Sequence, residues 1–133
     1  MVQVAVRLLL DTHALLWWLL GDSALSGRAR SAIADRSNEV FVSAASAWEI
    51  SIKYKQGKLP AAGRLVSSLD VIVSGQGFAE LPITIENGEA AGMLPLLHKD
   101  PFDRALVAQA LISKLILVSS DAVFDGYGVA RLW

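Results

Sequence analysis

Short apolar runs recur along the chain, separated by longer segments that fit helices. The first run is Arg7–Leu10, which ends at an acid, and the second is Glu39–Ser43 (EVFVS). Continuous apolar runs of this length are typical of strands that are buried on both faces. Further strands are expected at Phe78–Leu81, at Leu115–Ser120 and in the GVARLW sequence at the C-terminus.

The segments between the strands are predicted to be helical from their caps and breakers. The expected helices are Thr12–Leu20, a helix capped by Ser26 that runs to about Arg36, residues 44–56, about Arg64–Ser74, Thr84 to about Leu94, and Pro101–Ser113. Ser and Thr are favoured helix caps, and glycine commonly ends a helix. Apolar strands that alternate with helices predict a three-layer α/β/α fold with a central, mainly parallel sheet.

The composition narrows the class of protein. A chain of 133 residues is long enough for one domain with a core, here residues 1–133, and its net charge of −1 gives no global case for nucleic acid. The absence of cysteine excludes disulfides. The chain has only two histidines, which argues against a histidine-rich zinc site. The longest apolar run, residues 14–20, is too short to span a bilayer, and the start lacks signal-peptide features. We therefore expect a cytoplasmic protein without a membrane partner.

Four acids lie near the carboxyl ends of predicted strands, and each has an ordinary structural explanation. Asp11 and Asp121 directly follow strands, where acids commonly cap helices and turns. Glu49 lies two turns into a helix and is spaced for an ion pair with Lys53. Asp103 lies in the first turn of a helix, where an acid suits the helix dipole.

The shared location of these acids favours a functional explanation as well. In an open parallel sheet, ligands bind at the carboxyl ends of the strands, near the point where strand order reverses. If the first and fourth strands are neighbours, the four carboxylates converge, and like charges then raise one another's pKa. A hard divalent cation relieves that repulsion, and Mg²⁺ and Mn²⁺ prefer oxygen ligands. Such a site suits hydrolysis of phosphodiester bonds.

Four segments, taken in order and spacing, resemble PIN-domain proteins and, more narrowly, the VapC-type toxins of bacterial and archaeal toxin–antitoxin pairs. The segments are DTHALLWWL, SAASAWEISIK, DPFDRALVAQA and SSDAVFDGYGV. The resemblance covers nearly the whole chain from Leu8 onward and implies an endoribonuclease that depends on Mg²⁺ or Mn²⁺. It also implies RNA as substrate, a small cognate antitoxin lying across the active-site groove, and a homodimer or a toxin–antitoxin hetero-oligomer.

The resemblance also implies roles for individual residues. The acidic residues of the family fall on Asp11, Glu49, Asp103 and Asp121, which are the expected catalytic and metal-binding residues. Asp11 and Asp103 are expected to be the core ligands, and Glu49 to bind metal or orient the attacking water. Asp121 is expected to complete the site or hold a second ion. Ser119 stands where the family often has Thr and keeps the hydroxyl.

Basic residues near the acids are candidate contacts to RNA. Lys53, Lys55 and Lys58 follow Glu49, with Tyr54 between them. These lysines either complement the dipole at the helix end or contact phosphates, with Tyr54 available for base stacking.

Arg104, next to Asp103, either contacts phosphate or forms a surface ion pair. We take Lys53, Arg104 and Ser119 as the predicted substrate-binding residues.

Five aromatic or imidazole positions complete the prediction. Adjacent residues of a helix point about 100° apart, so only a wide apolar face buries both Trp17 and Trp18. Either both lie in the core or one lies on a partner surface. Trp48 is predicted to be a core residue, and His13 and His98 are placed outside the site.

Two alternatives differ in function class. One is a catalytically weak PIN-like module that binds RNA or regulates a partner, although such a module would not need all four carboxylates. The other is a receiver-type phosphoacceptor domain, which would need paired acids after the first strand and a lysine after the last main strand. The chain has a single acid, Asp11, at the first position and Ser119, Ser120 and Asp121 at the second.

Overall fold

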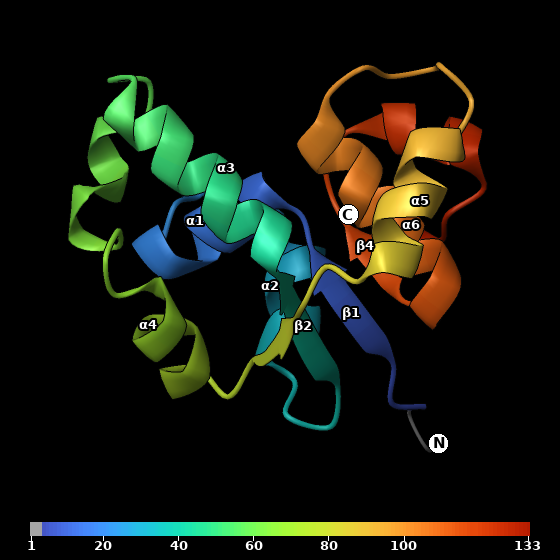
Figure 1. Ribbon diagram of the computed structural model, residues 1–133. Coiled ribbons are helices and arrows are strands. Elements are labelled where there is room, and N and C mark those ends of the chain that lie inside the picture. Colours follow the sequence, from blue (N-terminus) through green and yellow to red (C-terminus); the bar gives the residue numbers. More distant parts are fainter. Residues whose placement is uncertain (1–3) are drawn as a thin grey trace.

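The computed structural model describes residues 4–133 and contains a five-stranded parallel sheet (Figure 1). The strands are β1 (Arg7–Leu10), β2 (Glu39–Ser43), β3 (Ala79–Leu81), β4 (Ile116–Val118) and β5 (Arg131–Leu132). Their order across the sheet is β3-β2-β1-β4-β5. The predicted parallel sheet is confirmed, and β1 pairs with both β2 and β4, so the strand order reverses at β1.

The helices are α1 (Thr12–Leu20), α2 (Gly27–Ala34), α3 (Ala44–Lys55), α4 (Leu69–Gly75), α5 (Ile85–Met93) and α6 (Pro101–Ser113), with 3₁₀ helices η1 (Pro60–Arg64) and η2 (Ala122–Tyr127). The predicted caps Ser26, Ser43 and Thr84 accept backbone N–H groups at the starts of α2, α3 and α5. Across residues 4–133, the helices are all too short or too polar to cross a membrane.

Three element predictions need correction. The strand expected at Leu115–Ser120 is confined to Ile116–Val118. The helix expected over about Arg64–Ser74 is divided into η1 and α4, because Ser67 adopts a left-handed backbone with φ 75° that a continuous helix does not allow. The strand expected in GVARLW is confined to Arg131–Leu132, and the turns of η2 before it were not predicted.

The sheet separates two apolar clusters, which confirms the three-layer architecture. Leu8 and Leu10 pack into one cluster beneath α1, α2, α3 and α4, whereas Leu9 between them packs with Leu106 and Leu117 beneath α6. This alternation follows from the period of two in a strand. Helices cover both faces of the sheet (Figure 1). In such a sheet a ligand binds at the carboxyl ends of the strands, where the loops to the helices begin.

The tryptophans differ in part from their predicted places. Trp48 is 60% exposed and packs edge-on against Phe102, so the prediction that it belongs to the core is wrong. It lies on the flank of α3, away from the face that buries Ile50. Trp17 and Trp18 are half-buried and both pack against the cluster that contains Leu8.

Candidate active site

A cleft of about 470 Å³ lies at the carboxyl ends of β1 and β4 and brings all four predicted acids together. Asp11, Glu49, Asp103 and Asp121 line it, and so does a fifth acid, Asp100, which was not predicted as a site residue. The cleft forms where β1 has neighbours on both sides, which is the position expected for a ligand site in an open parallel sheet.

Asp11 has a structural and a chemical role at once. Its carboxylate accepts the N–H of Ala14 at 2.7 Å and so caps α1, while its own N–H donates to the Val118 carbonyl at 3.0 Å. The residue is 7% exposed, and burial raises the pKa of its carboxyl group. A hydrogen bond from Ser119 opposes that rise in part. The prediction that Asp11 caps a helix is confirmed, and the same side chain lines the cleft.

Ser119 connects two of the acids and is not available to a substrate, which corrects its predicted role. It is fully buried; its hydroxyl accepts the Asp121 N–H at 3.0 Å and acts on the Asp11 carboxylate, whose pKa it lowers. Asp121 is exposed, and its side chain accepts the N–H of Val123 at 3.0 Å at the start of η2.

Replacing Ser119 tests this connection. We expect Ser119→Ala to lower the free energy of unfolding by about 1–2 kcal/mol, because the Asp11 carboxylate and the Asp121 N–H both lose a buried partner. Urea unfolding measures the change. Ser119→Thr, which keeps the hydroxyl, should lose less, and Ser120→Ala at the exposed neighbour should stay within about 0.5 kcal/mol of the parent. Equal stability of Ser119→Ala and the parent would contradict the assignment.

Glu49 is held at both of its carboxylate oxygens. It is 2% exposed; the Thr12 hydroxyl donates to Oε1 at 2.5 Å, and the Lys53 ammonium pairs with Oε2. The predicted pair between Glu49 and Lys53 is therefore confirmed. The hydrogen bond from Lys53 to Glu49 raises the pKa of the Lys53 ammonium, which keeps it charged at neutral pH.

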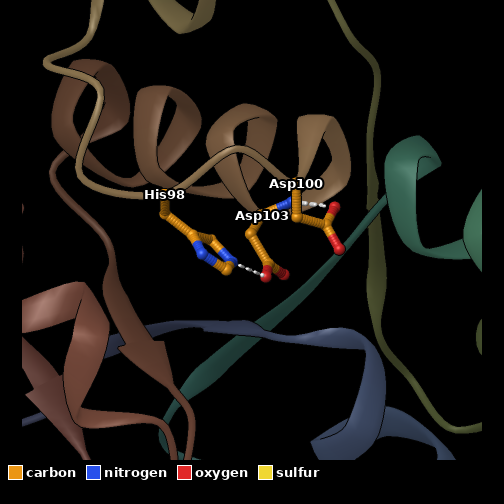
Figure 2. Close-up of side chains that lie close together, drawn as sticks. All are labelled: His98, Asp100 and Asp103. Atoms are coloured by element: carbon orange, nitrogen blue, oxygen red, sulfur yellow. Dashed lines mark hydrogen bonds and ion pairs between the residues drawn. The ribbon is translucent and has the colours of Figure 1, made fainter.

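Asp103 lies beside His98 and Asp100 in the loop and first turn of α6 (Figure 2). His98 Nε2 lies 2.6 Å from Asp103 Oδ2, and one donor atom from each of the three residues lies within 4.8 Å of the others. Burial raises the pKa of Asp103 to about 6 despite the opposing hydrogen bond to His98. His98 therefore contacts the site and His13 lines the cleft, so placing both outside the site was wrong.

Asp100 begins α6 by accepting the N–H groups of Phe102 and Asp103 at 2.8 and 3.2 Å, through the same oxygen, Oδ1. An acid directly before Pro101 is a typical sequence signal for such a cap. The position of Asp100 in the cleft has no such signal, because it depends on the packing of α6 against α3.

Arg104 does not have either of its predicted roles. The residue is buried, and its guanidinium donates to four carbonyl oxygens at 2.8–3.3 Å, those of Gly92, Leu94, Pro95 and His98. It neither faces the cleft nor forms a surface ion pair. Successive helical residues point about 100° apart, so the neighbour of Asp103 is directed away from the acids and toward the loop between α5 and α6.

The donor set of the cleft fits a hard divalent cation. Five acids and a single lysine line it, and burial raises the pKa of both Asp11 and Asp103. Carboxylates whose ionised form is disfavoured by burial gain most from a nearby positive charge. Their oxygen atoms are the ligands that Mg²⁺ and Mn²⁺ prefer. Asp11, Asp103, Asp121 and Glu49 are the residues that would hold such an ion, with Asp100 beside them.

Three solved structures are similar in fold. VapBC2 from Rickettsia felis, in a structure bound to a DNA fragment from its promoter, aligns with a TM-score of 0.70 at 14% identity. The alignment covers 96% of this chain and 98% of that chain. FitAcB from Neisseria gonorrhoeae aligns with a TM-score of 0.63 at 18% identity, covering 95% of this chain and 96% of that chain. A domain of a functionally unknown protein from Methanocaldococcus jannaschii aligns with a TM-score of 0.60 at 15% identity, covering 97% of this chain and 91% of that chain.

Sequence comparison identifies the family. No curated protein sequence matches the chain. The family model that describes the PIN domain matches residues 8–129, which include every acid of the cleft. By this match, the chain belongs to the PIN domain family.

Proposed function

We propose that the protein is an endoribonuclease that depends on Mg²⁺ or Mn²⁺ and acts as the toxin of a toxin–antitoxin pair. One observation carries the proposal: five carboxylates converge in one cleft at the point where strand order reverses, and the pKa of Asp11 and of Asp103 is raised by burial. When bound, the divalent ion would polarise the scissile phosphate and lower the pKa of a water nucleophile.

The residues of the cleft have separate proposed roles in catalysis. Asp11 is fixed by Ala14 and Ser119, and Asp103 by His98, so both carboxylates are oriented before substrate binds. Glu49 would bind the ion or orient the attacking water, which is the role that the family resemblance implies. Lys53 is the lysine that lines the cleft and the candidate contact for a substrate phosphate.

The fold similarity supports the proposed partners. The Rickettsia felis protein is described as a VapBC pair bound to a promoter fragment. For this chain we propose RNA as substrate, a small cognate antitoxin as inhibitor, and a homodimer or toxin–antitoxin hetero-oligomer in the cytoplasm.

The first test is cleavage of total cellular RNA by purified protein free of antitoxin, in Mg²⁺, in Mn²⁺ and in EDTA, beside Asp11→Asn. We expect discrete fragments with either ion and none in EDTA or with the variant. Asparagine can still cap α1, so circular dichroism should show the variant folded. No cleavage in any lane by a folded protein that binds RNA would favour an RNA-binding module instead. Cleavage that persists in EDTA would overturn the metal-dependent mechanism.

A further inference from the structure

Lys53 is the lysine that lines the acidic cleft, and its charge is already engaged there. Its ammonium pairs with Glu49, and its side chain is 32% exposed whereas that of Glu49 is 3% exposed. Asp100 and Asp103 also act on the Lys53 charge across the cleft. The cation therefore lies among three of the five acids.

Glu49 needs a positive charge wherever the cleft contains no metal ion. A buried carboxylate without a counter-charge is strongly destabilising. Thr12, on the other oxygen, supplies a hydrogen bond but no charge. Lys53 is thus the residue that neutralises Glu49 in the described structure.

The side chain of Lys53 is suited to leave this position. Lysine carries a compact charge on a flexible four-carbon stem. Arg104, in contrast, is fixed by four carbonyl oxygens and points away from the acids. The partial exposure of Lys53 gives its ammonium a path toward the open side of the cleft, where a phosphate would approach.

We propose that Lys53 is an exchangeable counter-ion: it neutralises Glu49 in the metal-free cleft, leaves that carboxylate when a divalent cation binds, and then becomes free to contact a substrate phosphate. The inference rests on the divalent-cation site of the proposed function and deepens it. It makes Lys53 a positioning residue for Glu49 in one state and a substrate contact in the other.

This exchange predicts opposite effects on two properties. Removing the Lys53 charge should tighten metal binding, because the ion no longer competes with an ammonium for Glu49. The same change should slow RNA cleavage, because the phosphate loses its contact. A lysine that only contacts phosphate would alter cleavage without altering metal affinity, and a lysine that only supports the fold would weaken both.

The experiment measures binding of Mn²⁺ alone to the full chain at pH 8, by titration calorimetry and by the electron paramagnetic resonance signal of free Mn²⁺. We expect Lys53→Met to bind Mn²⁺ about tenfold more tightly than the parent. Lys55→Met is the matched control: it removes the same charge two residues away on an exposed position that belongs to none of the ion pairs within residues 4–133, and should leave the affinity within about twofold. Unchanged or weaker binding by Lys53→Met overturns the inference.

A second measurement uses the unaltered protein, so it does not depend on how well Lys53→Met folds. Pulse acetylation of lysines with an N-hydroxysuccinimide ester, read by mass spectrometry, should label Lys53 about threefold faster with saturating Mn²⁺ than in EDTA, because the amine no longer pairs with Glu49. Labelling of Lys55 should stay constant. Equal or slower labelling of Lys53 with Mn²⁺ would contradict the exchange.

Neither measurement contains RNA, which separates this inference from the proposed function. A parent protein that binds Mn²⁺ and cleaves RNA, beside a Lys53→Met variant of unchanged affinity, would overturn the exchange alone. A protein that shows the exchange but cleaves no RNA would overturn the proposed activity alone. A protein that binds no Mn²⁺ at millimolar concentration would overturn both.

Discussion

Asp103→Asn should abolish RNA cleavage while making the metal-free protein more stable at neutral pH. The variant removes a carboxylate that would hold the divalent ion, and the loss of several kcal/mol of transition-state stabilisation corresponds to about a thousandfold or more in rate. The amide keeps the size of the side chain and removes a charge whose burial is unfavourable, as the raised pKa of Asp103 indicates. Single-turnover cleavage and urea unfolding in EDTA measure the two effects.

The pH dependence gives this prediction its sign. The pKa of Asp103 is about 6 in the folded protein and 3.8 in the unfolded chain, so the folded state binds the proton more tightly. The contribution of protonated Asp103 to the free energy of unfolding is complete below about pH 4 and is lost as pH rises through about 6. The rise from 3.8 to about 6 corresponds to at most about 3 kcal/mol.

The Asn variant should therefore match the parent near pH 4 and exceed it by about 1–2 kcal/mol at pH 8, after loss of the His98 hydrogen bond. Asp125→Asn is the control, because an exposed ion pair with Arg131 lowers the pKa of Asp125 and no such gain is expected. A less stable Asp103→Asn at pH 8 would show that the His98 bond outweighs the cost of burial.

Arg104→Met should be among the most destabilising substitutions in the chain. Four carbonyl oxygens, one in the last turn of α5 and three in the loop to α6, would lose a charged donor, and the apolar replacement would leave several of them partly buried and unpaired. We expect a loss of about 3 kcal/mol or more, measured by urea unfolding, with faster amide exchange in residues 94–99.

Two further variants define what Arg104 contributes. Arg104→Lys keeps the charge but offers a point donor in place of the planar fork, so it should recover only a small part of the stability. Arg30→Met removes a half-buried arginine whose solvent-exposed hydrogen bond goes to one carbonyl, that of Asp22, and should change stability by less than about 0.5 kcal/mol. A loss below 1 kcal/mol for Arg104→Met would mean that water replaces the guanidinium.

The elements that the sequence predicted well are those set by local pattern. Arg7–Leu10 and Glu39–Ser43 are strands with the predicted bounds, because a short apolar run that must be buried on both faces has few other solutions. Pro101–Ser113 is a helix with the predicted bounds because Asp100 and Pro101 mark its start. The break at Ser67 carries no comparable signal, since serine seldom adopts positive φ.

The candidate site was predictable in its acids but not in the surrounding contacts. Acids at strand ends and the family resemblance indicated the four carboxylates, and their convergence needed only that β1 and β4 be neighbours. The contact of His98 with Asp103 depends on the path of an irregular loop that Arg104 holds from within. Side chains that act across the fold in this way leave no periodic pattern in the sequence.

The capping role of Asp11 bears on how inactive relatives would evolve. A descendant that had lost cleavage would still benefit from Asp, Asn or Ser at this position, because the start of α1 needs an acceptor for the Ala14 N–H. An acid there is therefore weak evidence of activity in any newly sequenced relative. The Asp103 carboxylate, in contrast, forms its hydrogen bond within residues 4–133 with the His98 side chain and caps no helix. Its replacement would be the earlier and clearer mark of a pseudoenzyme.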